Sequence, residues 1–168
     1  MTEQVTNTSD KEKKLDFILM WDTENRRPNT KAIINIWPYL IEGIEKIIEI
    51  SDGDFSKGLV FNKILAGELF LWVAFIDGVI AGFVTARINP NLDAKTYLTI
   101  NQVYSKKGVT ADYFFKSWKK IEEFAKSCKC NNLRMVTMDE KWGDGLSKLG
   151  WKRSYIEYTY SLNGDNHE

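Results

Sequence analysis

Two long apolar runs joined by one short turn dominate the middle of the sequence. They lie in "ELFLWVAFIDGVIAGFVTARI", residues 68–88, where only Asp77-Gly78 interrupts the β-branched, aromatic and small residues. An Asp-Gly pair tolerates the positive φ angles of a type I′ turn, so this stretch predicts a β-hairpin. Because both runs are almost continuously apolar, we expect the hairpin to be central in a sheet and covered on both faces.

Ahead of the hairpin, apolar residues recur at the spacing of two helices. The first set is Trp37, Leu40, Ile41, Ile44, Ile47 and Ile48. A proline suits the first turn of a helix, so we expect this helix to start at Pro38. The preceding "KAIINIW" (31–37) is interpreted either as a strand or as the lead-in to the helix. A second helix is predicted over residues 55–66, with Gly67 closing it.

After the hairpin, the pattern changes from strand to helix and back to strand. "TYLTINQVY" (96–104) and "NLRMVTM" (132–138) predict two strands. Between them, helical spacing connects Phe114, Trp118, Ile121, Ala125 and Cys128. Such a crossover places two parallel strands in one sheet. "WGDGLSKLGW" (142–151) then predicts a short helix or turn, and "SYIEYTYSL" (154–162) a last strand.

These elements predict an α/β fold in which helices flank both faces of a mixed sheet. A chain of 168 residues suits one domain, which we place at residues 31–162. Residues 1–30 are expected to form a polar, partly flexible arm, and residues 163–168 a polar tail. Within the arm, "LDFILMW" (15–21) predicts a strand or an arm that packs on the body.

The charge balance bears on the expected partners. Lys plus Arg number 23 and Asp plus Glu number 23, so the chain has no net field to attract nucleic acid or an anionic membrane. We therefore expect neither as a partner. No apolar run approaches the ~20 residues of a membrane span, and the polar start lacks the apolar core of a signal peptide. A cytoplasmic location is expected.

Histidine and cysteine usage excludes several chemistries. The only histidine, His167, lies in the terminal "NGDNHE", so catalytic Ser-His-Asp and Cys-His units are not expected. Cys128 and Cys130 have no nearby histidine and cannot complete a zinc site by themselves. We expect no metal, and we expect both cysteines to be reduced thiols near the end of a helix.

In order and motifs, the segment 31–162 resembles the GNAT acetyltransferase superfamily. The hairpin is similar to the superfamily's central hairpin, and "IEEFAKSCKCNNLRM" (121–135) resembles its central helix running into the fifth strand. "LSKLGW" (146–151) is similar to the frequent Y-x-K-x-G-F near the C-terminus. More narrowly, "LWVAFIDGVIAGFVTARI", "FAKSCKCNNLRM" and "KWGDGLSKLGW" resemble a divergent branch often seen in bacteriophage genomes.

The resemblance implies a cofactor, acetyl-CoA, in a cleft where the fourth and fifth strands part. Its pantetheine would pair with the backbone of the fourth strand, here Asn101, Gln102 and Val103. Its pyrophosphate would lie on the loop formed by Lys106, Lys107, Gly108, Val109 and Thr110. An amine of a small molecule or a protein would then attack the thioester directly.

The loop itself is open to two interpretations. Gly108 can stand for the first glycine of the family's phosphate loop, whereas Thr110 occupies the place of the second. Thr110 suits an N-cap and Asp112 suits the first helical turn, and both features stabilise an empty helix end. The loop either binds the pyrophosphate or is a self-satisfied turn.

Candidates for proton transfer are Asp139, Glu140 and Tyr104. The tyrosine that the superfamily often places before K-x-G-F corresponds here to Leu146, which cannot ionise. As a base, either carboxylate would need a pKa raised by burial; the alternative is a solvated loop charge. Tyr104 either reaches the mouth of the cleft or is an ordinary half-buried aromatic.

Two hypotheses of function follow. The first is an N-acetyltransferase that moves acetyl from acetyl-CoA to an amine. The second is a catalytically silent domain of the same fold that serves as an interaction or structural component of a protein assembly, such as a phage particle. In that case the chain would occur in the host cytoplasm or in the virion. Fold alone does not decide between them.

Overall fold

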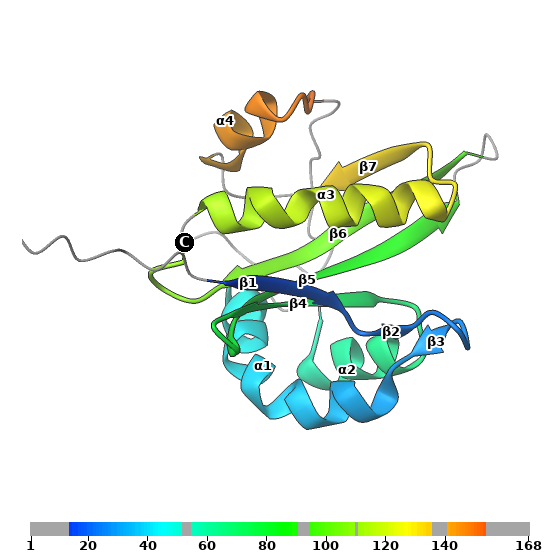
Figure 1. Ribbon diagram of the computed structural model, residues 1–168, viewed down its shortest axis with the longest axis vertical. Helices are drawn as coiled ribbons and strands as arrows, with labels where there is room; N and C mark the ends of the chain where they lie inside the picture. Colours follow the sequence, from blue (N-terminus) through cyan, green and yellow to red (C-terminus); the bar gives the residue numbers. More distant parts are fainter. Residues whose placement is uncertain (1–13, 52–54, 91–94, 110, 136–140, 154–168) are drawn as a thin grey trace, which may run out of the picture. The chain divides into compact units, whose positions relative to one another are not determined.

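The computed structural model describes residues 14–51, 55–90, 95–109, 111–135 and 141–153 (Figure 1). All elements up to β7 lie in one compact unit, residues 1–136, and α4 (Lys141–Lys148) lies in a second unit, residues 137–168. The element predicted within residues 142–151 is thus observed as a helix. The strand predicted at 154–162 lies outside the described residues.

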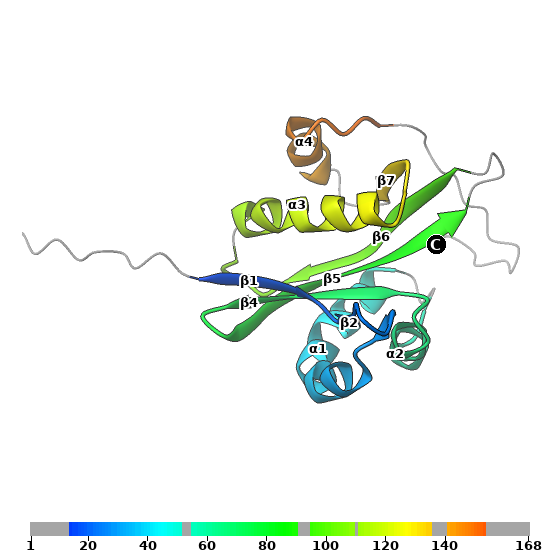
Figure 2. The same cartoon turned by 45° about the vertical axis from the view of Figure 1, so that its right-hand side comes forward.

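In the larger unit, the described residues form a five-stranded sheet in the order β1-β4-β5-β6-β7 (Figures 1 and 2). The strands are β1 (Leu15–Leu19), β4 (Phe70–Ile76), β5 (Val79–Pro90), β6 (Thr96–Ser105) and β7 (Asn132–Met135). Neighbours are antiparallel except β6 and β7, which are parallel. The short strands β2 (Trp21–Asp22) and β3 (Arg27–Pro28) pair separately. The predicted mixed sheet and its parallel crossover are confirmed.

The predicted hairpin is the centre of this sheet. Asp77 (φ 51°) and Gly78 (φ 79°) both have positive φ, as a type I′ turn requires. Side chains of β4 and β5 are buried on both faces; among them are Leu71, Trp72, Val73, Phe83 and Val84. The continuous apolar pattern therefore identified a strand pair that is covered on both sides.

Helices cover both faces of the sheet. α1 (Thr30–Ile50) and α2 (Lys57–Leu65) lie on one face, and α3 (Ala111–Ser127) lies on the other (Figures 1 and 2). The larger apolar core lies beneath α1 and α2 and includes Ile33, Leu40, Ile44, Val60, Ile64, Leu71, Val73 and Phe83. On the α3 face, Phe124 packs edge-on against Trp72, with 5.1 Å between ring centres.

The start of the first helix was predicted wrongly. α1 begins at Thr30 rather than at Pro38, because the side chain of Asn29 caps it by accepting a hydrogen bond from Ala32 N. Pro38 lies inside the helix, on its exposed side. A proline there removes the backbone bond to Ile34, whose side chain is also exposed. Water can therefore satisfy the freed carbonyl, and the helix tolerates the proline.

Of the two interpretations of residues 15–21, the strand is observed. β1 pairs with β4 from Leu15↔Ile76 to Leu19↔Trp72. Lys120 of α3 also donates from its Nζ to the Phe17 carbonyl at 3.0 Å. Residues 15–19, ahead of α1, are thus part of the five-stranded sheet.

Both cysteines follow α3 and are half-buried free thiols. Burial, with a smaller contribution from Cys128, raises the pKa of the Cys130 thiol and keeps it neutral at pH 7. The described residues hold no group of three His, Cys, Asp or Glu side chains that could bind a metal. In the same part of the chain, no helix is long and apolar enough to cross a membrane.

Candidate active site

The described pairing of the two parallel strands covers only part of β6, because the residues that follow Met135 lie outside the described part of the chain. Their register runs from Tyr97↔Asn132 to Ile100↔Met135. β6 continues to Ser105, still paired with β5 on its other side. Among the described residues, no strand pairs with the outer edge of 101–105. Backbone N–H and C=O groups of a strand edge without a partner can hydrogen-bond a ligand that pairs like a strand.

A β-bulge follows directly on the described β6–β7 pairing. Thr85 of β5 faces Gln102, but the next residue, Ala86, faces Ile100, so Asn101 is an extra residue in β6. A bulge bends its strand and increases the local twist. The bend at Asn101 thus follows directly on the last described β6–β7 pair, Ile100↔Met135.

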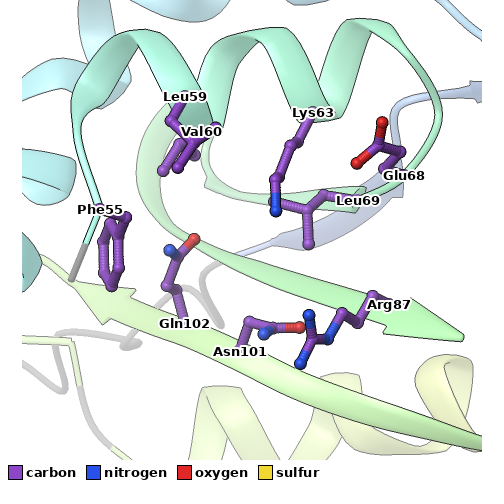
Figure 3. Close-up of a pocket in the computed structure, with 9 residues that line it drawn as sticks. All are labelled: Phe55, Leu59, Val60, Lys63, Glu68, Leu69, Arg87, Asn101 and Gln102. Carbon is purple, nitrogen blue, oxygen red and sulfur yellow. The ribbon is translucent and has the colours of Figure 1, made fainter. Parts of the chain in front are cut away.

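A pocket of about 360 Å³ opens beside the bulge, between α2 and the strands β5 and β6 (Figure 3). Its apolar lining consists of Phe55, Leu59, Val60 and Leu69, and its polar lining of Lys63, Glu68, Arg87, Asn101 and Gln102. Polar residues make up more than half of this lining, and the volume lies near the lower end of the range for small-molecule sites.

One polar group of the pocket is held in place by the sheet. Thr85 Oγ1 donates to Gln102 Oε1 at 2.6 Å, and both residues are buried. The hydrogen bond fixes the side-chain oxygen of Gln102. Its amide nitrogen is left to face the pocket, and Figure 3 shows the Gln102 side chain pointing toward α2.

Three charged side chains in the pocket lining were not predicted as functional. They are Lys63, Glu68 and Arg87, and none has an ion pair with another described residue. Each comes from a different segment, namely α2, the connection to β4, and β5. The one sequence feature that could have pointed to these residues is Arg87, a charged residue near the end of a largely apolar run.

In the predicted phosphate loop, some backbone N–H groups are hydrogen-bonded within the protein and others have no described acceptor. Lys106 N donates to Ala81 O at 2.8 Å and Val109 N donates to Lys106 O at 3.1 Å, so these two N–H groups are used internally. The N–H groups of Lys107 and Gly108 have no acceptor among the described residues. Gly108 has φ 90°, and a Cβ there would meet nothing within 4 Å. These two N–H groups and the open space fit a phosphate; Thr110 lies outside the described residues.

Tyr104 lies on the same face of the sheet as Gln102, against α1. Its ring packs on Phe83, with 5.6 Å between ring centres, and close to Gly43, where a Cβ would collide with it. The Lys46 ammonium lies 5.7 Å from the ring centre. Lys46 is also the main cause of the lowered pKa of Glu42, to which the Tyr104 side chain contributes a little. Tyr104 is therefore a half-buried aromatic beside a surface ion pair.

The other two proton-transfer candidates, Asp139 and Glu140, lie outside the described residues. Of the predicted cofactor contacts on β6, Asn101 is the bulge residue and contributes to the pocket lining together with Gln102. Val103 pairs with the buried Val84. The structure thus brings Asn101, Gln102 and three unpredicted charged residues together around one pocket.

No protein-family model matches the sequence, and no curated protein matches it significantly. Solved structures of acetyltransferases do match the fold. The aminoglycoside N-acetyltransferase AAC(6')-Iy in complex with CoA matches with a TM-score of 0.65 and 14% identity, over 92% of this chain and 99% of that chain. Its complex with a CoA-containing bisubstrate analogue gives 0.66 and 15%, over 89% and 99%.

A ribosomal-protein-alanine N-acetyltransferase from Brucella melitensis biovar Abortus 2308 matches with a TM-score of 0.64 and 10% identity, over 89% of this chain and 100% of that chain. Identities this low establish the fold alone. The chain therefore has the GNAT fold that its sequence predicts.

Proposed function

We propose that the chain is an N-acetyltransferase that moves acetyl from acetyl-CoA to an amine by direct attack. The observation that carries the proposal is the edge of β6 that has no partner among the described residues; it begins at the bulge residue Asn101 and lies beside a pocket of about 360 Å³. Two of the similar structures contain CoA or a CoA conjugate, so this fold accommodates the cofactor.

The roles of the chain's residues follow from this placement. The outer backbone groups of Asn101, Gln102 and Val103 hydrogen-bond the amides of the pantetheine arm. The N–H groups of Lys107 and Gly108, with the lysine charges and the start of α3, hold the pyrophosphate. When bound there, acetyl-CoA supplies an activated thioester. The pocket orients the acceptor amine and removes it from bulk water.

Transfer also needs a group that takes the proton of the amine and one that protonates the leaving thiolate. Asp139, Glu140 and Tyr104 remain the candidates proposed from the sequence. Tyr104 lies two residues along β6 from Gln102, on the pocket side of the sheet. Its hydroxyl group would serve as the proton donor, provided that the thioester reaches that end of β6.

The proposal predicts that acetyl-CoA stabilises the folded protein. A ligand at 100 times its dissociation constant adds about 2.7 kcal/mol to the free energy of unfolding. We therefore expect acetyl-CoA and CoA to raise the melting temperature by several degrees in a thermal-shift assay. Acetyl transfer to amines would release CoA thiol, which a thiol reagent detects. An unchanged melting temperature at millimolar acetyl-CoA would contradict the proposal.

Two glycines provide a matched pair of variants for the same assay. Gly108 and Gly78 both have positive φ, and a Cβ at either would meet nothing within 4 Å. Gly108→Ala and Gly78→Ala should therefore each cost about 1–2 kcal/mol of stability through backbone strain. Only Gly108→Ala should also weaken acetyl-CoA binding, by about tenfold, because its methyl group enters the phosphate space.

The silent-domain alternative has one observation in its favour. The N–H group of Lys106 is satisfied by Ala81 O of β5 and that of Val109 by Lys106 O, which suits a turn that binds nothing. The bacteriophage branch and the virion role rest on the sequence resemblance alone and stay predictions. If neither acetyl-CoA nor CoA changes the melting temperature, the silent domain is the better account.

A further inference from the structure

We propose that the acceptor is a small amine that also carries an anionic group, a carboxylate or a phosphate, which Lys63 and Arg87 bind. The inference rests on the proposed function, because it treats the pocket beside the bulge as the acceptor site. It goes beyond that function by stating the chemical class of the acceptor.

The position of the pocket connects it to the reaction. Asn101 contributes to the pocket lining, and its backbone begins the part of β6 that has no partner on the β7 side among the described residues. A thioester carried along that edge would pass within one residue of the pocket. An amine held in the pocket is therefore next to the acetyl group that it attacks.

The charge in the pocket favours an anion. Lys63 and Arg87 supply two positive charges and Glu68 one negative charge, and none of the three is paired with another described residue. The guanidinium of Arg87 presents a planar fork of N–H donors, which matches a carboxylate or a phosphate. Figure 3 shows the Lys63 and Arg87 side chains extending into the space between α2 and the strands.

The single carboxylate suits the amine end of such a molecule. Glu68 is held near Lys63, because the N–H groups of Glu68 and Leu69 donate to Lys63 O at 2.9 and 3.1 Å. One carboxylate can attract one ammonium group. A molecule with several ammonium groups would leave the others facing Lys63 and Arg87, and this repulsion disfavours it.

The volume of the pocket also favours a small acceptor with few charges. About 360 Å³ is near the lower end of the ~300–1,000 Å³ of small-molecule sites. Phe55 and Leu59 give one wall an apolar surface, so the pocket suits a small zwitterion with a short apolar part. Sisomicin, the ligand in one of the similar structures, is a polycationic aminoglycoside and fits this description poorly.

The test compares amines in pairs that differ in the anionic group. The pairs are β-alanine with β-alaninamide, L-leucine with L-leucinamide, and phosphoethanolamine with ethanolamine, and sisomicin serves as the polycation. Release of CoA thiol gives kcat/KM for each amine, and ligand-observed NMR on the protein without acetyl-CoA gives binding. The first two pairs test a carboxylate, and the third tests a phosphate.

We expect the anionic member of at least one pair to bind more tightly and to be acetylated with about tenfold higher kcat/KM. Lys63→Gln and Arg87→Gln should each reduce that ratio about tenfold. Lys119→Gln, an exposed lysine of α3 outside the pocket, is the matched control and should leave the ratio unchanged.

The outcomes separate the two proposals. Acetyl transfer that prefers the neutral members or sisomicin, or a ratio unaffected by Lys63→Gln and Arg87→Gln, overturns the inference and leaves the acetyltransferase standing. If acetyl-CoA does not bind but an anionic amine binds in a manner that Arg87→Gln weakens, the proposed function fails and the anionic-amine pocket stands. If neither acetyl-CoA nor any anionic amine binds, both proposals are overturned.

Discussion

A buried hydrogen bond between two neutral side chains shapes the wall of the pocket. Thr85 and Gln102 are 1% and 8% exposed, and they face each other across β5 and β6 directly beside the bulge. A buried polar group costs little when it is paired and much more when it loses its partner. The pair therefore sets the orientation of Gln102 and favours this register of the two strands.

Replacing Thr85 by valine should show this cost. The side chain keeps its shape but loses the hydroxyl, so Gln102 Oε1 is left without its partner, and we expect a loss of about 1–2 kcal/mol in the free energy of unfolding. Urea denaturation followed by circular dichroism measures it. Thr99→Val is the control, because Thr99 is half-buried and bonds Asn89 nearer the surface at 2.8 Å. Equal stability of Thr85→Val and the wild type would refute the argument.

The charged residues of the pocket show how little a single sequence position reveals about a binding site. Asn101 and Gln102 were predicted as backbone contacts of a cofactor, from their place in the strand. Lys63, Glu68 and Arg87 were not predicted, because each is an ordinary surface charge in its own segment. Only the packing of α2 against β5 and β6 brings them together.

Among the elements, α1 departs most from its prediction. The proline rule placed its start at Pro38, but the Asn29 cap and the apolar spacing of Ile33, Leu40 and Ile44 carry the helix through the proline. Burial of that apolar face outweighs the lost backbone bond, because the bond is lost on the exposed side. A favourable first-turn residue is a weaker signal than an N-cap followed by a continuous apolar face.

Removing this proline should therefore stabilise the protein. Pro38→Ala restores the backbone bond to Ile34 O, and although it frees the unfolded chain slightly, we expect a net gain of about 1–2 kcal/mol. Thermal and urea denaturation measure the change. Tyr39→Ala, at a neighbouring position that is 67% exposed, is the control and should change stability by less than about 0.5 kcal/mol. A loss of stability in Pro38→Ala would contradict this argument and show that the proline itself stabilises the protein.

At the scale of the larger unit, the sheet combines a fully paired centre with a partly open strand. β4 and β5 are each paired on both sides, whereas β6 loses its described partner on the β7 side beyond Ile100. Amide protection follows hydrogen bonding and burial, so the two regions should differ in exchange.

Hydrogen exchange measured by mass spectrometry tests this difference. Peptides covering 101–105 should exchange faster than peptides covering 70–76 in the free protein, and they should slow down when acetyl-CoA is added. Peptides from α1 serve as the internal control and should not respond to the cofactor. Slow exchange of 101–105 without a ligand would mean that the edge is already paired, and it would remove the space that the proposed function needs.

The sequence by itself determined the elements whose signals are local. The Asp-Gly turn between apolar runs fixed the hairpin, and the helical spacing up to Ala125 fixed α3, because turn geometry and periodicity act between near neighbours. Tertiary structure alone decided that Asn101 is bulged out of register and which charges share the pocket. Those features depend on contacts between residues far apart in the chain, and a linear pattern of polar and apolar positions does not encode these distances.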